Sequence, residues 1–293
     1  MPSQVTQVGR RFDVRVLTWN LAFSSPSRAA LQGNYLRTLE PDLVCLQELN
    51  PASAESVRQH AELKWLSYQL DPSEASGSGR RRLAAVGGRI ELVGAMPQIR
   101  ALPLPERVHV ARVATHGIEM LAISYHAPPG VSWGYRKVEQ ALGFLDWLND
   151  ASEPLVLGAD ANTPEIDHPD FLLTRTHWHT GMRRLGGLPG DDLVWGPARS
   201  HRLSDSYRLW LQEHADALAE IRRLRPAGPL AESHWTGKRR NASGTGRRFD
   251  SIWVSPELSV IAVSYLSDAL ALSDHAAVLA DLCVVEKIVR EPG

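Results

Sequence analysis

The chain has 293 residues, of which 43% are hydrophobic and 22% are charged. Its 32 basic and 33 acidic side chains leave a formal net charge of −1. This composition is typical of a globular protein and excludes an intrinsically disordered chain. The balanced charge also excludes a polybasic protein that binds nucleic acid over its whole surface, and equally an acidic tail protein.

The N-terminal part alternates short apolar runs with amphipathic stretches. Residues 14–21 predict a strand that ends at Asn20, and residues 43–47 predict a second strand closed by Glu48. Residues 53–65 predict a helix with Ser53 as a candidate cap. Another helix is predicted over residues 27–39, and its apolar face would be Ala30, Leu31, Tyr35 and Leu39. Residues 71–82 have the composition of a loop, which ends in three arginines.

A hairpin is predicted next, with strands at residues 107–114 and 118–125 and with His109 and His116 on its surface. Residues 135–148 predict a strong amphipathic helix. Residues 155–157 predict a buried strand that leads into Asp160 and Asn162. Residues 215–224 predict a helix, and residues 225–248 predict a long loop of the kind that is often functional. The last predicted strands cover residues 249–254 and 276–285.

Cys45 and Cys283 are too few for a disulfide framework or a multi-cysteine zinc site, and their apolar surroundings predict buried thiols. Residues 1–13 are polar and contain no apolar stretch typical of a signal peptide. No run approaches the roughly 18 apolar residues of a membrane span. We therefore expect a soluble, cytoplasmic protein. No segment has the composition of a linker, which predicts a single domain over residues 1–293 with its core at about 14–285.

Side chains that can bind a cation or carry a proton stand at the ends of the predicted strands. Those that follow a strand are Asn20, Glu48, His126 and Asp160. Those at the start of a strand are Asp250, Asp274 and His275. Because antiparallel neighbours place the end of one strand beside the start of the next, these side chains are expected to converge on one edge, with Asn162 as a further member.

The chemistry of this set suits a hard divalent cation. Mg²⁺ and Mn²⁺ prefer carboxylate and amide oxygens, and no cluster of cysteine and histidine favours zinc. His126 and His275 are expected to titrate near neutral pH, and Asp250 can fix the tautomer of His275. A cation combined with such His and Asp groups can neutralise a phosphate, orient a water and protonate a leaving group. The set therefore predicts phosphoester hydrolysis.

Six segments resemble motifs of the endonuclease/exonuclease/phosphatase superfamily, which includes deoxyribonuclease I-like nucleases, apurinic endonucleases, sphingomyelinases and inositol-polyphosphate phosphatases. In the family's order they are LTWN (17–20), LQE (46–48), SYHAP (124–128), GADANTP (158–164), RFDSI (248–252) and LSDH (272–275). The resemblance covers nearly the whole chain. It implies an α/β (α+β) fold, a four-layer α/β sandwich in which two packed, mostly antiparallel sheets are flanked by helices.

The resemblance also implies a set of metal ligands. Glu48 would be the main ligand of Mg²⁺, with Mn²⁺ as an alternative, and Asn20 would support it. Asp274 would contribute to metal binding or orient its neighbour. Asp160 and Asn162 would bind the metal or the phosphate and would position or activate the attacking water.

The catalytic residues that the resemblance implies are His275, Asp250, His126, Asp160 and Asn162. His275, paired with Asp250, would contact the phosphate and act as the acid/base group. His126 matches a histidine of the deoxyribonuclease I and sphingomyelinase branches, where it assists protonation of the leaving group, whereas apurinic endonucleases usually have tyrosine. The chain departs from the family at Ala159, which stands where glycine commonly precedes the aspartate, so the local turn is in question.

Several other residues have plainer interpretations. Tryptophans within strands, Trp19 and Trp253, are expected in the core. Trp133, Trp195 and Trp235 lie in loop-like stretches where a base could stack, although anchoring is the more common role. His177 and His179 lack a third ligand. The arginine-rich segments 80–82 and 238–248 would be solvated loops or, beside the site, its positive borders.

Three functions remain open at this point. The leading hypothesis is a Mg²⁺-dependent phosphodiesterase or nuclease, a monomer that takes a phosphate-ester substrate, nucleic acid among the options, and needs no protein partner. A phosphomonoesterase acting on a small or lipid phosphate is the alternative of the same class. A non-catalytic binding module on the same fold is the alternative of another class, and the completeness of the residue set disfavours it.

Overall fold

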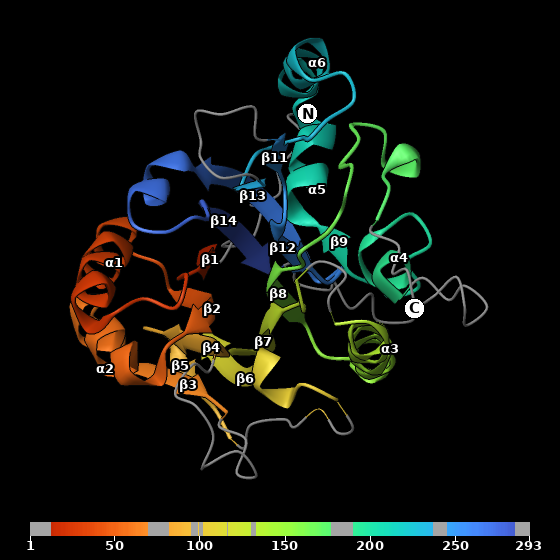
Figure 1. Cartoon of the computed structure of the whole chain (residues 1–293). Helices are drawn as coiled ribbons and strands as arrows, with labels where there is room; N and C mark the ends of the chain where they lie inside the picture. The colour runs from red at the N-terminus through yellow and green to blue at the C-terminus, as the bar shows by residue number, and fades with distance from the viewer. Residues whose placement is uncertain are drawn as a thin grey trace, which may run out of the picture.

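The computed structural model describes residues 13–69, 82–94, 99, 102–115, 117–129, 133–176, 190–236 and 245–284. Within this part of the chain, two six-stranded sheets pack against each other (Figure 1). The first sheet has the spatial order β13 (Leu258–Leu266), β14 (Ala277–Val284), β1 (Asp13–Asn20), β2 (Leu43–Leu49), β4 (Leu83–Gly88) and β3 (Trp65–Tyr68). The second has the order β5 (Glu91–Leu92), β6 (Val108–Thr115), β7 (Ile118–His126), β8 (Leu155–Asp160), β12 (Asp250–Val254) and β9 (Ser204–Asp205).

Most neighbouring strands run antiparallel, as expected, while β1 pairs with β2 and β7 pairs with β8 in parallel. Helices α1 (Pro26–Leu39) and α2 (Pro51–His60) cover the outer face of the first sheet (Figure 1). Helices α3 (Tyr135–Asp150) and α4 (Gly190–Trp195) cover the second. Helix α5 (Ser206–Glu213) packs on β12 and β13 and leads into α6 (Ala215–Leu224). Helices and sheets thus form a four-layer α/β sandwich, and this confirms the expected fold.

Strand β1 shows why its sequence is apolar on both faces. Val14 and Val16 belong to the core between the two sheets, and Leu17 and Trp19 belong to the core under the helices. Successive side chains of a strand point to opposite faces. Because both faces of β1 are covered, its apolar residues run almost without interruption. Trp19 and Trp253 are buried, as are Cys45 and Cys283, so these four predictions are confirmed.

Gly158 in β8 lies where the two sheets approach each other closely. A Cβ atom added there would lie 2.5 Å from the Cβ of Cys45 and 2.8 Å from the Cβ of Thr18, both in the first sheet. Ala159, the residue that departs from the family pattern, faces the other way into the core under α3. Both residues lie within β8, and the close approach to the first sheet occurs at the glycine before Ala159.

Replacing Gly158 with alanine is expected to destabilise the fold by about 2 kcal/mol, because the added methyl must push apart two tightly packed sheets. Urea unfolding followed by circular dichroism measures this change. Ser264→Thr is the matched control, since it adds one methyl group at an exposed position of β13 and should change stability by less than about 0.5 kcal/mol. Equal stability of the two variants would contradict the close approach.

Two predicted helices need correction. Helix α2 begins at Pro51, where the Asn50 side chain accepts a hydrogen bond from Ala52 N, so Ser53 is not the cap. It ends at His60, and Trp65 already begins β3. Helix α1 has the predicted span, but its apolar face was wrong, because Leu31 is 56% exposed. The buried side chains of α1 are Ala29, Gln32, Gly33 and Leu36.

Packing of α1 against α2 explains the second correction. At Gly33 a Cβ atom would lie 2.7 Å from the Cβ of His60, so only glycine allows the two helices to pack this closely. Gln32 beside it donates from Nε2 to the carbonyl oxygens of Leu21 and Leu272. These two bonds satisfy the buried Nε2 group and make a polar side chain acceptable at this position. Apolar spacing alone therefore selected the wrong face.

The predicted loop at residues 225–248 contains a two-stranded ribbon, formed by β10 (His234–Thr236) and β11 (Thr245–Arg247). Arg248, expected at a positive border, is instead buried and forms ion pairs with Asp205 at 2.6 Å and Asp167 at 3.3 Å. A buried charge persists only when it is paired, and these carboxylates pair it. His109, expected on the surface, is also buried and hydrogen bonds to Ser67 at 2.8 Å between Nε2 and Oγ.

The remaining predicted elements agree with the structure. The hairpin forms as β6 and β7, and the helices at 135–148 and 215–224 form as α3 and α6. Predictions for His116, His177, His179, and segments 71–81 and 238–244 lie outside the described residues. Among the helices described, none is long and apolar enough to cross a membrane.

Candidate active site

Backbone pairing brings three predicted residues together at one edge of the second sheet. His126 ends β7 and is the register partner of Asp160, which ends β8. Asp160 is in turn the register partner of Asp250, the first residue of β12. From the first sheet, Asn20 at the end of β1 donates from Nδ2 to Asp160 Oδ2 at 2.8 Å. The expected convergence of the strand ends therefore holds for these four residues.

Glu48 reaches the same place through an irregularity of β2. The pairing of β2 with β4 shifts between Leu46 and Leu49, and Glu48 has a φ of 51°. This left-handed conformation is unfavourable for a residue other than glycine, and such strain concentrates at functional sites. The preceding Gln47 is buried and donates from Nε2 to Ser124 Oγ at 3.1 Å on the other sheet. Gln47 therefore anchors the segment that presents the Glu48 carboxylate.

The Glu48 carboxylate faces two cationic or imidazole groups. Its Oε1 accepts a hydrogen bond from Arg82 Nη1 at 2.6 Å and lies 3.6 Å from His126 Nε2. Burial raises the pKa of Glu48, while Arg82 and His275 oppose this rise. The Arg82 side chain is 48% exposed against 11% for Glu48. Of the two predicted arginine borders, the first thus has its last residue, Arg82, at the site.

His126 is fully enclosed and remains a neutral imidazole. Arg107 Nη1 lies 3.0 Å from His126 Nδ1, and a guanidinium can only donate a hydrogen bond. The proton of the neutral ring is therefore assigned to Nε2, which lies 3.6 Å from both Glu48 Oε1 and Asp160 Oδ2. Burial, followed by the charges of Arg107 and His275, holds the pKa of His126 well below its usual value. The expectation that His126 titrates near neutral pH was wrong for this reason.

Asp160 and Asn162 form a tight turn after β8. Asn162 has a φ of 47°, and its backbone N–H donates to Asp160 Oδ1 at 3.0 Å. Asn162 Nδ2 donates to the carbonyl oxygen of Ala127 at 2.9 Å, which fixes the amide plane. Burial raises the pKa of Asp160 to about 7, with His275 opposing the rise and Asp250 adding to it. A carboxylate with such a pKa can exchange a proton near neutral pH.

Asp250 and His275 form a buried pair. His275 Nδ1 lies 2.8 Å from Asp250 Oδ2, and His275 Nε2 lies 3.9 Å from Asp160 Oδ2. Burial lowers the pKa of His275, but the charges of Asp250 and Asp160 outweigh it and raise the pKa to about 10. His275 is thus an imidazolium at neutral pH rather than a group that titrates there. The predicted pairing of Asp250 with His275 is present.

The backbone around Asp250 is fixed by residues that the sequence did not indicate. Ser233 Oγ accepts hydrogen bonds from the backbone N–H groups of Phe249 and Asp250, each at 3.0 Å. Tyr265 donates its hydroxyl to the Asp250 carbonyl oxygen at 2.9 Å. Asp250 Oδ1 is buried and has no hydrogen-bond partner in the described part of the chain. That oxygen remains able to accept a hydrogen bond from a group in the site.

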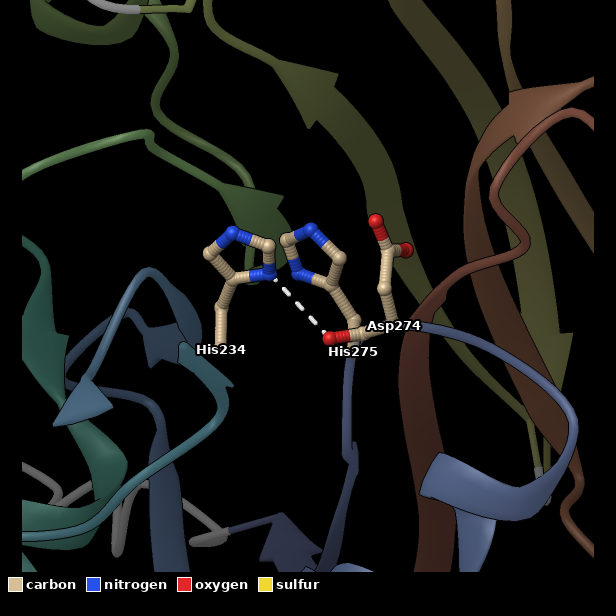
Figure 2. A group of neighbouring side chains, drawn as sticks. All are labelled: His234, Asp274 and His275. Atoms are coloured by element: carbon tan, nitrogen blue, oxygen red, sulfur yellow. Dashed lines mark hydrogen bonds between the residues drawn. The ribbon is translucent and has the colours of Figure 1, made fainter. Parts of the chain in front are cut away.

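Asp274 is the exposed member of the set. Its carboxylate lies beside the His275 ring, and its charge contributes to the raised pKa of His275 (Figure 2). His234, at the start of β10, stacks on the other face of His275 with ring centroids 4.4 Å apart. His234 lies in the segment 225–248, which the sequence predicted to be a loop, and no sequence pattern indicated that this histidine belongs to the site.

Another residue that the sequence did not indicate is Arg107. It is buried before β6, at the end of a 3-10 turn (Pro105–Arg107), and its guanidinium lies 5.0 Å from the ring centroid of Trp133. A cation over an aromatic face is held by the ring quadrupole. Trp133 is therefore an anchor for Arg107, while Trp195 is buried in the core. A lone arginine before a strand carries no sequence signal that could have revealed this contact.

The site has the donor set of a hard cation. Asp160, Asp250 and His275 form a buried group whose ligand atoms lie within 4.8 Å of one another and could hold a metal ion. Burial is the main cause that raises the pKa of both Glu48 and Asp160, and a cation bound beside these carboxylates would favour their charged forms. Because the Arg82 side chain is partly exposed, it can move away from Glu48 and allow this carboxylate to bind a cation. The residues present therefore fit a divalent metal ion.

Comparison with known proteins gives one family. The profile described as "Endonuclease/Exonuclease/phosphatase family" matches residues 17–275. No curated protein sequence matches the chain.

Solved structures with the same fold are numerous. An endonuclease/exonuclease/phosphatase from Bacteroides vulgatus has a TM-score of 0.62 at 15% identity, covering 94% of this chain and 100% of its own. D. rerio TDP2, complexed with a single-strand DNA product, has a TM-score of 0.60 at 14% identity, covering 92% and 98%. A mannosyl-6-phosphatase from Bacteroides thetaiotaomicron has a TM-score of 0.60 at 16% identity, covering 92% and 99%. At these identities the likeness concerns the fold.

Proposed function

The chain belongs to the endonuclease/exonuclease/phosphatase family, and from this premise we propose that it is a divalent-metal-dependent phosphodiesterase of the nuclease type. One observation carries the proposal. The buried Asp250–His275 pair, with its 2.8 Å contact, stands beside Asp160, and Glu48 lies across His126 from Asp160. This arrangement places hard oxygen ligands, a charged imidazolium and a carboxylate of pKa about 7 around one point.

In this proposal the metal is Mg²⁺, or alternatively Mn²⁺, and Glu48 is its main ligand. Asn20, Asp160 and Asn162 supply further oxygens, and Asp274 contributes to metal binding or orients His275. The bound ion would neutralise phosphate charge and polarise the ester. The Oδ1 of Asn20 accepts one hydrogen bond, from Ala22 N, and keeps a second lone pair for the cation, while its Nδ2 bonds to Asp160.

The proton chemistry is assigned to the chain's own side chains. Asp160, positioned by Asn162, accepts the proton of the attacking water. His275, held by Asp250, contacts the phosphate through Nε2 and, as an imidazolium, gives its Nε2 proton to the leaving oxygen. His126 donates its Nε2 hydrogen toward the leaving oxygen, but its low pKa keeps it from carrying a positive charge. It is therefore a hydrogen-bond donor in this mechanism rather than a second imidazolium.

A phosphodiester is the preferred substrate class, with nucleic acid as the first choice. Support comes from His126, from Arg82 and Arg107 at the site, and from the D. rerio structure that holds a single-strand DNA product. Because a mannosyl-6-phosphatase has the same fold, a phosphomonoester is the alternative substrate.

A substrate panel tests the proposal. The purified chain is assayed with Mg²⁺ or EDTA on single- and double-stranded DNA, RNA, sphingomyelin, inositol phosphates, bis(p-nitrophenyl) phosphate and p-nitrophenyl phosphate. We expect Mg²⁺-dependent cleavage of diesters, with nucleic acid cleavage weakened by salt because phosphate contacts release counterions. Faster cleavage of monoesters would replace the diester assignment. No cleavage of any substrate by a folded, Mg²⁺-loaded chain would instead favour a binding module.

The proposal treats residues 1–293 as one domain, because both sheets contribute residues to the same site. It also takes the protein to be a cytoplasmic monomer that needs no protein partner. Size-exclusion chromatography coupled to light scattering measures the oligomeric state directly.

A further inference from the structure

His234 and His275 form a stacked pair at the rim of the site. Their ring centroids are 4.4 Å apart and the ring planes differ by 25°. The two residues come from distant segments, β10 and the residues before β14, which are joined by an isolated antiparallel bridge between His234 and His275. This backbone bridge thus holds the two rings next to each other.

Hydrogen bonds fix which nitrogen of each ring is free. His275 Nδ1 lies 2.8 Å from Asp250 Oδ2, and His234 Nδ1 lies 3.1 Å from the carbonyl oxygen of Asp274. Carboxylate and carbonyl oxygens accept hydrogen bonds, so the Nδ1 atom of each ring carries a hydrogen. Both Nε2 atoms are then the free positions. Histidines that bind metals have this arrangement, in which the second nitrogen donates to a carboxylate or a backbone carbonyl.

Asp274 supplies a third donor beside the two rings. One ligand atom from each of His234, Asp274 and His275 lies within 4.8 Å of the others. Figure 2 shows the carboxylate of Asp274 and the outer nitrogens of both rings on the same side of the group. Ligands of a tetrahedral zinc ion lie about 2.0–2.3 Å from it, so the set must contract slightly. Asp274 is exposed and can make this movement by rotating its side chain.

We propose that His234, His275 and Asp274 form a second cation site, which takes a borderline divalent metal of the Zn²⁺ class. Two imidazole nitrogens and one carboxylate suit zinc and cobalt, whereas magnesium prefers the all-oxygen set around Glu48. Three protein ligands leave a fourth position open to water or a phosphate oxygen. An ion bound there displaces the proton on His275 Nε2, and the carboxylates around His275 attract a dication as they attract a proton.

An oxyanion is the competing occupant, and the tautomer of His234 disfavours it. A phosphate oxygen needs a hydrogen-bond donor, but the Asp274 carbonyl holds the hydrogen of neutral His234 on Nδ1. The outer nitrogen of that ring therefore offers a lone pair. Asp274 adds a negative charge beside it, which repels an anion and attracts a cation.

The site has a consequence that rests on the proposed function. His275 Nε2 is assigned there to the phosphate, and a zinc ion on the same nitrogen would remove that hydrogen-bond donor. We therefore expect micromolar-range additions of Zn²⁺ to inhibit Mg²⁺-dependent hydrolysis by the native chain, on the order of tenfold or more. The inhibition should disappear in His234→Ala when each rate is compared with the same variant without zinc.

The decisive test is binding of Co²⁺, measured by visible absorption with Mg²⁺ held in excess. The full-length chain is expected to bind one Co²⁺ with the bands of tetrahedral nitrogen and oxygen coordination, and Zn²⁺ should displace it. His234→Ala and Asp274→Asn should each weaken Co²⁺ binding by at least about tenfold. His214→Ala, which removes an exposed histidine at the end of α5, is the matched control and should bind as the native chain does.

The readout separates this proposal from the proposed function, because Glu48→Gln should lose hydrolysis and keep the cobalt bands. Bands that persist in both His234→Ala and Asp274→Asn would overturn the assignment and place the ion with Asp160, Asp250 and His275 instead. An absence of bands in the native chain would also overturn it. The assignment would also be overturned if a chain that binds no Co²⁺ bound inorganic phosphate in a manner that depends on His234. Asp274→Asn, at an exposed position, keeps the test valid if His234→Ala fails to fold.

Discussion

Replacing Glu48 with glutamine is expected to reduce Mg²⁺-dependent hydrolysis of bis(p-nitrophenyl) phosphate by about 10³-fold or more. A divalent cation contributes several kcal/mol of charge stabilisation in the transition state, and each 1.4 kcal/mol corresponds to about a factor of ten in rate. Glutamine keeps the size of the side chain but loses the charge that would hold the cation. Initial rates at saturating Mg²⁺ for the native chain and the variant measure the effect.

Stability should respond quite differently to the same substitution. Burial raises the pKa of Glu48, so the folded protein gains little from keeping this carboxylate charged. We therefore expect the urea midpoint of Glu48→Gln to stay close to that of the native chain. Glu62→Gln is the matched control, since Glu62 forms an exposed ion pair with Arg37. If Glu48→Gln hydrolyses the diester as fast as this control, Glu48 is not the metal ligand.

Replacing His275 with alanine is expected to lower kcat by about 10²–10⁴-fold, the range typical for loss of a general acid or base. The imidazolium is held by Asp250 and faces Asp160, and no other described side chain supplies a second imidazolium at this point. His126 cannot replace it, because its pKa is held well below the usual value. A loss smaller than tenfold would remove His275 from the acid/base role.

A pH profile separates this chemical role from a structural one. The pKa of His275 is about 10 because the charge of Asp250, ahead of that of Asp160, outweighs the lowering effect of burial. In Asp250→Asn the pKa of His275 should fall, so the imidazolium loses its proton at a lower pH. The alkaline limb of kcat/KM against pH should move to lower pH in the variant, while a purely structural defect would lower the whole profile without moving it.

The sequence was most informative where a chemical requirement and a local pattern coincide. Apolar strands are interrupted by a charged or amide side chain at Asn20, Glu48, Asp160 and Asp250. Such a side chain costs free energy at a buried position, so its presence there indicates a functional role. Pairing of neighbouring strands then placed His126, Asp160 and Asp250 side by side, as the strand ends predicted. The four-layer arrangement followed from family resemblance rather than from these patterns alone.

The sequence failed where a contact joins residues that are far apart in the chain. The buried face of α1 depends on how closely α2 approaches Gly33, and apolar spacing carries no record of that approach. Arg248 belonged by composition to a solvated loop, yet Asp167 and Asp205 make it a buried structural cation. Both errors arise because a polar or small residue becomes favourable in the core only when its partner is present.

By itself the sequence determined the residue types of the site, the order of its motifs and the fold that could hold them, because these follow from local pattern and family resemblance. Only the tertiary structure decided that His275 is an imidazolium, that His126 is neutral, and that His234 stacks on His275. A pKa depends on burial and on charges within a few ångströms, and folding brings those neighbours together from separate segments of the chain, as it brings Asp160 to His275.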